Sequence, residues 1–200
     1  MTSETNEPAQ NTNGAATAVE NADIKVGRAL ASKRNHPVIQ WCCGVGEVGD
    51  QGPLYLIGAS MVAVGLFRKS PRSLVTGVSL LMAVGVSDVA KSTVKRFVKR
   101  SRPHDLLDDG NYRFETGGSP EKKEQSFPSG HVAGAVAAAG TISRFYPTAG
   151  PYVKSAAAVI TLSRIVKGKH WPLDLAAGFV IGIVSDQVVK KLTTVIFGKR

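Results

Sequence analysis

Five apolar stretches separated by polar segments constrain the fold of this chain more than any other feature of its sequence. They cover residues 52–67, 73–90, 130–146, 150–166 and 174–189, and the last can continue to 197. Each is near the lower limit of the roughly 17–25 residues with which a helix crosses a bilayer. The stretches are rich in glycine, alanine, serine and valine, which lets helices pack closely within a membrane. We therefore expect an all-α fold, a membrane-embedded helical bundle of about five apolar helices.

Charged residues inside these stretches keep a second architecture open. They are Asp88, Arg144, Lys154, Arg164 and Asp186. The mean hydropathy of the chain is +0.00, between the values typical of soluble and membrane proteins. Small residues also suit a tight bundle in water. A soluble helical bundle is thus the alternative.

The N-terminal part of the chain differs in composition from the rest. Residues 1–24 are polar and lack Lys and Arg, so we expect a disordered acidic tail. Its acidic residues are Glu4, Glu7, Glu20 and Asp23. Residues 25–50 mix apolar and basic side chains, as an amphipathic helix at an interface does, and Pro37 should divide this region into two pieces. A soluble surface helix is the alternative there. Residues 51–197 would form the bundle.

The chain has a net charge of +10, and the apolar body after residue 24 carries about +14, because residues 1–24 contribute four acidic side chains and no Lys or Arg. The basic residues lie between apolar segments and not among surface aromatic residues, which favours anionic lipid head groups and a phosphate ligand over nucleic acid. By the positive-inside rule, the basic loop 68–72 and the basic C-terminus mark the cytoplasmic end of the bundle. The loops 91–129 and 168–173 would then face the outside.

The first motif with chemical meaning is KRFVKRSRP, residues 95–103. Lys95 and Arg102 are seven residues apart, which is about 700° of helical rotation, so both cations would lie on nearly the same helix face. Pro103 disfavours helical geometry at Arg102, so the helix should end there and leave the guanidinium free to turn towards a ligand. Alone, this motif is a weak signal, because Lys and Arg at a helix end are usually solvated or complement the helix dipole.

The second motif is FPSGH, residues 127–131, at the start of the apolar stretch 130–146. Ser129 is a suitable N-cap, and the amides of Gly130 and the following residues would be unpaired donors at the positive end of a helix. Such a helix start binds phosphate readily. His131 can donate a proton near neutral pH. A capping turn with an incidental histidine is the alternative.

The third motif is SRIVKGKHWPLD, residues 163–174. Pro172 is favoured in a first helical turn, so Asp174 should lie just inside the last helix and reach back to His170. A carboxylate that accepts from one imidazole nitrogen fixes the tautomer and leaves the other nitrogen nucleophilic. Arg164 offers a planar fork for a phosphate.

Together and in this order, the three motifs resemble the type 2 phosphatidic acid phosphatase superfamily, which includes bacterial nonspecific acid phosphatases and vanadium-dependent haloperoxidases. The family pattern is Lys, six residues, Arg-Pro; then Pro-Ser-Gly-His; then Ser-Arg, five residues, His, three residues, Asp. Every required position is present here, between residues 95 and 174. The resemblance extends over about residues 50–190 in the order of helices and does not cover the first 24.

The resemblance implies a mechanism and a role for each residue. His170 would be the nucleophile that forms a phosphohistidine, Asp174 would orient it, and His131 would be the general acid and then the base that activates water. The phosphate oxygens would be held by Lys95, Arg102, Ser129, Gly130 and Arg164. The scheme needs no metal ion and no cofactor, and the sequence has no compact cluster of carboxylates or cysteines with metal-ligand spacing.

The implied function is an integral-membrane phosphatase of a lipid phosphate monoester or diphosphate. Substrates of the polyprenyl phosphate, phosphatidylglycerol phosphate and phosphatidate types share the reacting group, and we favour a bacterial envelope lipid. The active site would lie on the extracytoplasmic face of the cytoplasmic membrane. Alternatives are a soluble acid phosphatase, a vanadate-dependent haloperoxidase and a non-catalytic membrane protein that binds phospholipid. The polar loop 104–126 joins two motifs and is expected to influence substrate choice.

Overall fold

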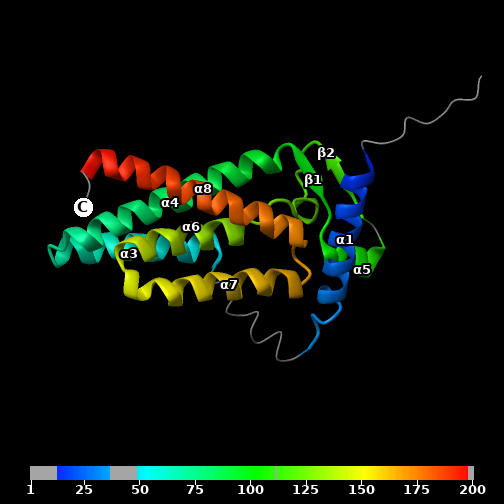
Figure 1. Cartoon of the computed structure of the whole chain (residues 1–200), viewed down its shortest axis with the longest axis horizontal. Helices are drawn as coiled ribbons and strands as arrows, with labels where there is room; N and C mark the ends of the chain where they lie inside the picture. The colour runs from blue at the N-terminus through cyan, green and yellow to red at the C-terminus, as the bar shows by residue number, and fades with distance from the viewer. Residues whose placement is uncertain (1–12, 37–48, 111, 198–200) are drawn as a thin grey trace, which may run out of the picture.

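The computed structural model of the chain describes residues 13–36, 49–110 and 112–197. Five long helices form the bundle in Figure 1: α3 (Gln51–Phe67), α4 (Pro71–Lys95), α6 (Gly130–Phe145), α7 (Gly150–Val166) and α8 (Pro172–Phe197). The other elements are the helices α1 (Asn13–Ala31) and α5 (Pro103–Asp109), the strands β1 (Val98–Arg100) and β2 (Phe114–Thr116), and the short 3-10 helices η2 (Lys122–Glu124) and η3 (Pro147–Ala149). The fold is therefore mostly helical, as the sequence predicts.

Each of the five apolar stretches forms one helix, and local sequence explains where these helices begin. Asp50 caps α3, where its carboxylate accepts from the amide of Gln51 at 2.9 Å. Ser70 caps α4 and precedes Pro71, whose fixed φ suits a first helical position. The helix α8 likewise begins at Pro172. The stretch predicted to end near residue 90 continues as helix to Lys95.

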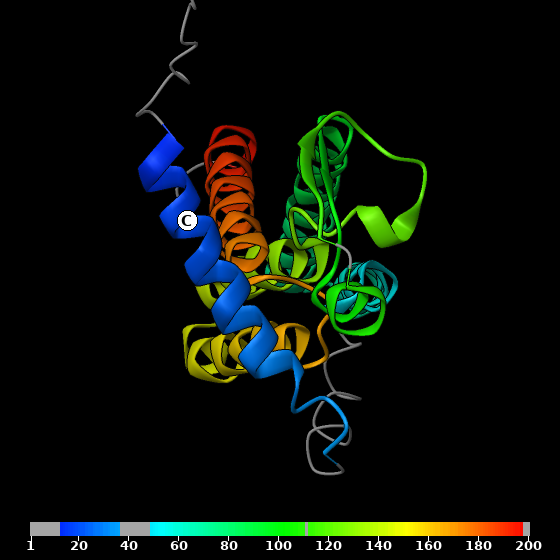
Figure 2. The ribbon, with the colours of Figure 1, turned by 90° about the vertical axis from the view of Figure 1, so that its right-hand side faces the viewer.

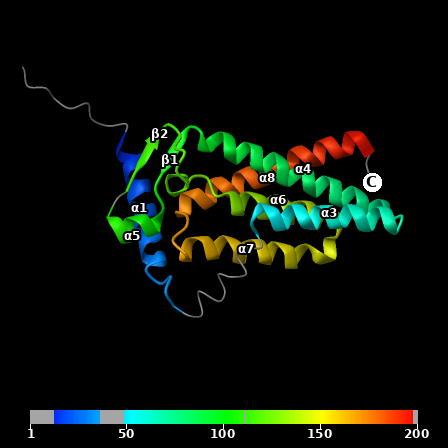
Figure 3. The same ribbon diagram turned by 180° about the vertical axis from the view of Figure 1, so that it is seen from behind.

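Small residues let the bundle helices approach closely. Helix α6 packs against α4, α7 and α8, and α3 packs along α4, as Figure 3 shows from the opposite side. Where α8 crosses α6, a Cβ added at Gly178 would lie 2.5 Å from the carbonyl oxygen of Ser129, and one at Gly182 would lie 2.7 Å from that of Ala133. Only glycine permits this separation, which holds the start of α8 against the start of α6.

Length and hydropathy support a membrane location. Among the described residues, α4 and the segment Pro172–Ile196 of α8 are long and apolar enough to cross a bilayer, and α3 is a shorter apolar helix. Large apolar side chains such as Leu56, Phe67 and Val195 are exposed on the outside of the bundle. This distribution fits a hydrocarbon environment. Crossing of the membrane by all five helices stays a prediction.

A small polar cap closes one end of the bundle. It consists of the antiparallel pair β1–β2, helix α5 and helix α1, which lies across the ends of α7 and α8 in Figure 2. The opposite end carries the basic turn between α3 and α4. The cap and the basic turn therefore lie at opposite ends of the bundle, as the charge pattern predicts for loops 91–129 and 68–72.

The disordered tail expected over residues 1–24 is wrong for residues 13–24, because these residues form the first part of α1. Asp23, Gly27 and Ala31 are buried on one face of this helix, at the spacing of successive helical turns. Acidic residues that suggested disorder are instead neutralised by partners in the cap, as described below. Residues 1–12, and 37–48 with Pro37, lie outside the described residues, so the division into three regions stays a prediction.

Candidate active site

The three motifs meet at the capped end of the bundle around a cavity of ≈ 210 Å³. Helix α4 contributes its last turns, α6 its first turn, and α7 its last turn, while loops carry the remaining side chains. The cavity is lined by Asp50, Lys91, Lys95, Arg102, Gly130, His131, Arg164, Lys169 and His170. Six of the eight predicted site residues are in this lining, and the other two, Ser129 and Asp174, are fully buried next to it.

Lys95 and Arg102 reach the cavity by a different route from the expected one. The prediction that both lie on one helix face is wrong, because α4 ends at Lys95 and residues 98–100 form strand β1. The chain pairs with β2 and returns to the cavity at Arg102, which has extended φ and ψ angles of -90° and 156° before Pro103. The influence of proline on the preceding residue was predicted correctly, and the strand pairing replaces the helix as the reason that the two cations meet.

His170 is held in a defined tautomer by the backbone. Its Nδ1 lies 2.8 Å from the carbonyl oxygen of Ser126, and a carbonyl can only accept, so the proton is on Nδ1 and Nε2 keeps its lone pair. The side chain is buried and lines the cavity. Burial lowers the pKa of His170, so the imidazole is neutral at pH 7. A neutral imidazole with a free Nε2 is the form that can attack phosphorus.

Asp174 lies behind His170, but it is not the closest acceptor. Its Oδ2 is 3.6 Å from Nδ1 of His170, which is too long for a direct hydrogen bond. The expectation that Asp174 accepts from an imidazole nitrogen and so fixes the tautomer is therefore wrong in detail, because the carbonyl of Ser126 occupies the position of closest approach. The carboxylate still lies close enough to stabilise positive charge on the ring.

Three groups fix the carboxylate of Asp174. Oδ2 accepts from the amide of Trp171 at 2.8 Å and from the hydroxyl of Ser126, and Oδ1 accepts from Nη1 of Arg100 at 2.8 Å. Ser126, Arg100 and Trp171 were not predicted as site residues. Arg100 belongs to the motif KRFVKRSRP, but nothing in the sequence shows that it points away from the cavity and towards Asp174.

The start of α6 supplies donors for an anion. Ser129 occupies the N-cap position, but its hydroxyl does not cap the helix, contrary to expectation. Within the described part of the chain, the buried Oγ of Ser129 and Nε of Arg102 have no hydrogen-bond partner. The unpaired amides of the first turn add to these donors. The hydroxyl is thus available to a bound phosphate instead of the helix.

Cations outnumber carboxylates around the cavity. Besides the predicted cations, Lys91 and Lys169 line it, and Asp50 is the single carboxylate among the lining residues. A Cβ at Gly130 would lie 2.8 Å from Cδ and 2.9 Å from Nζ of Lys91, so glycine makes room for this ammonium group. Lys91 also pairs with Asp88 at 2.9 Å. Lys91 lies four residues before Lys95 and therefore on the same helix face, which is a signal that could have identified it, but the motif does not include it.

His131 lies on the rim of the cavity, at the first turn of α6. Its Nε2 is 3.8 Å from Oδ1 of Asp50, the residue that caps α3. Asp50 was not predicted as a site residue, because a capping aspartate before an apolar helix is common in any fold. Among the described residues, no three histidine, cysteine, aspartate or glutamate side chains form a cluster that could hold a metal ion.

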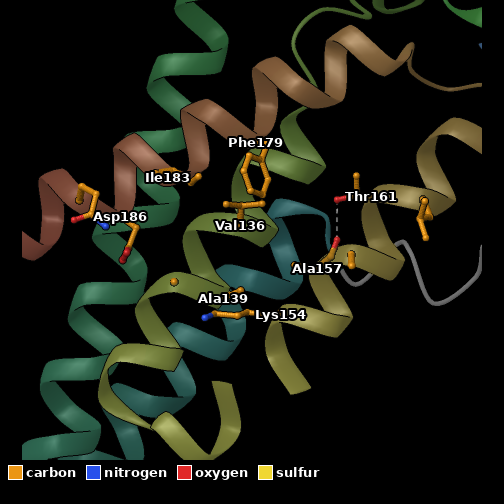
Figure 4. A pocket seen from close by; sticks show the side chains of 12 residues that line it. Val136, Ala139, Lys154, Ala157, Thr161, Phe179, Ile183 and Asp186 are labelled. Atoms are coloured by element: carbon orange, nitrogen blue, oxygen red, sulfur yellow. Dashed lines mark hydrogen bonds between the residues drawn. The ribbon is translucent and has the colours of Figure 1, made fainter. Parts of the chain in front are cut away.

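A larger cavity, of ≈ 720 Å³, lies elsewhere, between α6, α7 and α8. Figure 4 shows its mostly apolar walls, including Val136, Phe179 and Ile183, with Lys154 and Asp186 among the polar residues that line it. It contains none of the motif residues. The smaller charged cavity is therefore the candidate site.

Comparisons with known proteins match the part of the chain that carries the motifs. The model of the PAP2 superfamily matches residues 76–196, which include all three motifs. Decaprenylphosphoryl-5-phosphoribose phosphatase of Mycobacterium tuberculosis is 29% identical over 146 residues, 73% of this chain and 75% of that protein. Lipid A 1-phosphatase of Rhizobium etli is 29% identical over 106 residues, 53% of this chain and 45% of that protein.

Two solved structures have a similar fold. LpxE of Aquifex aeolicus superposes with a TM-score of 0.62 at 23% identity, over 84% of this chain and 93% of that one. The PAP2-type phosphatidylglycerolphosphate phosphatase of Bacillus subtilis gives a TM-score of 0.58 at 23% identity, over 92% of this chain and 89% of that one.

Proposed function

The chain belongs to the PAP2 superfamily, and from this premise we propose that it is an integral-membrane lipid phosphatase that acts through a phosphohistidine on His170. The substrate is a phosphate monoester or diphosphate of a lipid. The observation that carries the proposal is the buried, neutral His170, whose Nδ1 donates to Ser126 and whose Nε2 remains available in a cavity lined by cations. The similarity to lipid phosphatases supports the class of substrate.

In the first step, Nε2 of His170 forms a bond to phosphorus while the bond from phosphorus to the lipid oxygen breaks. His131 donates its proton to the leaving oxygen. Asp174 stabilises the positive charge that the imidazole ring acquires. In the second step, His131 takes a proton from water, the water oxygen attacks phosphorus, and the bond from phosphorus to Nε2 breaks to release inorganic phosphate.

The phosphate oxygens are held by Lys95, Arg102, Arg164, the hydroxyl of Ser129 and the amides at Gly130. Lys91 and Lys169 increase the positive potential of the cavity. Fixed donors of this kind stabilise the charge on the phosphoryl oxygens as it redistributes in the transition state. The mechanism uses no metal ion and no cofactor.

The substrate's polar group is selected by the loop 104–126. A second cavity of ≈ 410 Å³ lies beside the first, and Lys95 lines both. The remaining walls include Arg96 and the loop residues Ser119 and Gln125. Substitution of the loop residue Gln125→Ala should therefore change the ratio of kcat/KM between polyprenyl diphosphate and phosphatidate, and leave turnover of p-nitrophenyl phosphate unchanged. Equal effects on all three substrates would contradict a role in selection.

We favour a bacterial envelope lipid of the polyprenyl type as substrate, which the similarity to a decaprenylphosphoryl-5-phosphoribose phosphatase supports. The proposed location is the bacterial cytoplasmic membrane, with the capped end outside. The basic turn at Arg68, Lys69 and Arg72 lies at the opposite end, where the positive-inside rule expects the cytoplasm.

The experiment that tests this function is phosphate release by purified wild type and His170→Ala in detergent. The panel contains polyprenyl, glycerophospholipid and water-soluble phosphates. We expect wild type to prefer lipid phosphates and the variant to lose activity on all of them. Preference for soluble phosphates would favour the acid phosphatase alternative, and an absence of turnover would favour the phospholipid-binding alternative.

A further inference from the structure

Arg100 is buried completely, although it is charged. Its Nη1 donates to Oδ1 of Asp174 at 2.8 Å, and its Nη2 donates to Oδ2 of Asp23 and to the hydroxyl of Tyr112, the latter at 3.1 Å. The side chains of Arg100 and Asp174 are 0% exposed and that of Asp23 is 2% exposed. A charge removed from water is tolerated only with close partners, so these three residues depend on each other.

The surroundings of Arg100 fix its orientation. Its guanidinium carbon lies 4.7 Å from the ring centre of Phe114, 5.4 Å from that of Trp171 and 5.8 Å from that of Tyr112. Aromatic faces attract a cation, and the planar guanidinium can bind two carboxylates at once, which an ammonium group does with less directional control. The side chain is therefore held in one place between Asp23 and Asp174.

Helix α1 also contacts the backbone next to Asp174. Oδ1 of Asp23 accepts from the amide of Leu173 at 2.8 Å, in the first turn of α8, one residue before Asp174. A Cβ at Gly27 would lie 2.4 Å from the ring of Trp171, so α1 packs directly on the segment between His170 and Asp174. Glu20 continues the contact, because its Oε1 accepts from the hydroxyl of Tyr112 at 2.7 Å.

We propose that Arg100 and Asp23 are positioning residues for the reaction, and that α1 thereby completes the active site although it lies outside residues 76–196, which match the family. Asp23 orients Arg100, Arg100 orients Asp174, and Asp174 faces His170. None of the three touches the phosphate. This inference rests on the proposed function for its kinetic test, but not for its labelling test.

The charge of Arg100 should influence the pKa of His170. The groups that face His170 are Asp174 of α8, Lys95 at the end of α4, Arg102 before α5, and the cavity residues His131 and Arg164. Arg100 offsets part of the negative charge of Asp174. Without it, that carboxylate holds a proton on the imidazole more strongly, and the pKa of His170 should rise.

The test compares Arg100→Gln, Arg100→Lys, Asp23→Asn and the double variant Asp23→Asn with Arg100→Gln. Misplacement of a catalytic group commonly costs up to about 100-fold in rate, so we expect kcat to fall about 100-fold in Arg100→Gln and about tenfold in Asp23→Asn, with KM nearly unchanged. Arg100→Lys should restore part of kcat. The double variant should be no slower than Arg100→Gln, because Asn at position 23 keeps an oxygen that can accept from the amide of Leu173, and Asp23→Asn therefore removes only the contact with Arg100.

Two control variants separate positioning from general damage. Lys25→Ala changes an exposed residue of α1, and Arg113→Gln removes an exposed ion pair with Glu124 at 3.2 Å. Both should retain wild-type kcat. Thermal unfolding identifies any variant that fails to fold, and Asp23→Asn then carries the test because it preserves the size of the side chain.

A labelling measurement tests the same network without turnover. The rate at which diethyl pyrocarbonate modifies His170, followed by mass spectrometry of its peptide, reports the neutral fraction of the imidazole at each pH. We expect the midpoint to move to higher pH in Arg100→Gln and to stay unchanged in both controls. If folded Arg100→Gln and Asp23→Asn both kept the wild-type labelling midpoint and the wild-type kcat, the inference would be overturned. An inactive wild type with a shifted labelling midpoint would overturn the proposed function instead.

Discussion

The proposed nucleophile depends on which nitrogen of His170 carries the proton. The Ser126 carbonyl assigns that proton to Nδ1, and Asp174 lies one step further away, where Arg100, Ser126 and Trp171 hold it. The motifs contain the side chains that we propose to react. They do not identify Ser126, because its contribution is a backbone carbonyl that any residue type supplies. Motif spacing therefore predicts the participants better than it predicts their hydrogen bonds.

The pH dependence of the reaction follows from the burial of His170. Because burial lowers its pKa, the neutral and nucleophilic form should persist as the pH falls below about 6.5, the ordinary value for histidine. We expect the acidic limb of kcat/KM, measured with a soluble phosphate ester, to have its midpoint below that value. A midpoint above it would mean that the imidazolium is stabilised and that Asp174 outweighs burial.

Gly130 should be required for full activity, because a side chain at this position would displace the end of Lys91. In Gly130→Ala the new methyl group would displace the flexible end of Lys91 and leave the fold intact, so thermal stability should change little. Loss of one cation from an anion site typically costs about tenfold or more in kcat/KM. The double variant Gly130→Ala with Lys91→Ala is the control. If it were much slower than Lys91→Ala alone, the methyl group would be obstructing the phosphate itself.

At the scale of elements, the five apolar stretches were predictable because each has a continuous apolar composition and a recognisable start, such as Asp50 before α3 or Pro172 in α8. The cap was not. Strand β1 is three residues long and pairs with β2 across a loop, so it has no periodicity to detect. The part of helix α1 before residue 25 was missed because Asp23 is neutralised by Arg100, 77 residues away, a contact that local composition does not reveal.

The crossing of α6 and α8 should be sensitive to a single methyl group. Gly178→Ala would place a Cβ 2.5 Å from the backbone oxygen of Ser129, which cannot move without shifting the turn that we propose to bind phosphate. Overpacking of this kind costs about 1–3 kcal/mol, and we expect a lower melting temperature together with reduced activity.

Gly85→Ala is the matched control within α4. Its added Cβ would lie 3.7 Å from the hydroxyl of Tyr55, an ordinary contact, and alanine favours helix over glycine. Melting curves in detergent should show wild-type or slightly higher stability for this variant. Equal losses in both variants would show that the crossing is not tightly packed.

At the scale of the whole molecule, the chain combines an apolar bundle with a charged cavity at its capped end. Exposed apolar side chains cover the bundle, while the partners of the catalytic groups come from α1, β1 and the loops. This arrangement suits a substrate whose phosphate lies at the membrane surface and whose hydrocarbon part stays in the bilayer.

Release of the protein from the membrane should therefore require detergent. We expect the protein to remain in the membrane fraction after washing with high salt or carbonate and to be released by a mild detergent, because exposed apolar surface and not charge holds it there. Release by salt alone would favour the soluble alternative with the same active residues.

The central claim is that His170 carries the phosphoryl group, and the most direct measurement is to trap it. An activated ester such as p-nitrophenyl phosphate has a leaving group that needs no proton, so His131→Ala should still undergo the first step and be slow in the second. Rapid quenching in alkali, which preserves the bond from phosphorus to nitrogen, is followed by mass spectrometry of the peptide that contains residue 170. We predict a phosphorylated His170 that accumulates in His131→Ala and is absent from His170→Ala. Turnover by wild type with the label on another residue, or full activity in His170→Ala, would contradict the account.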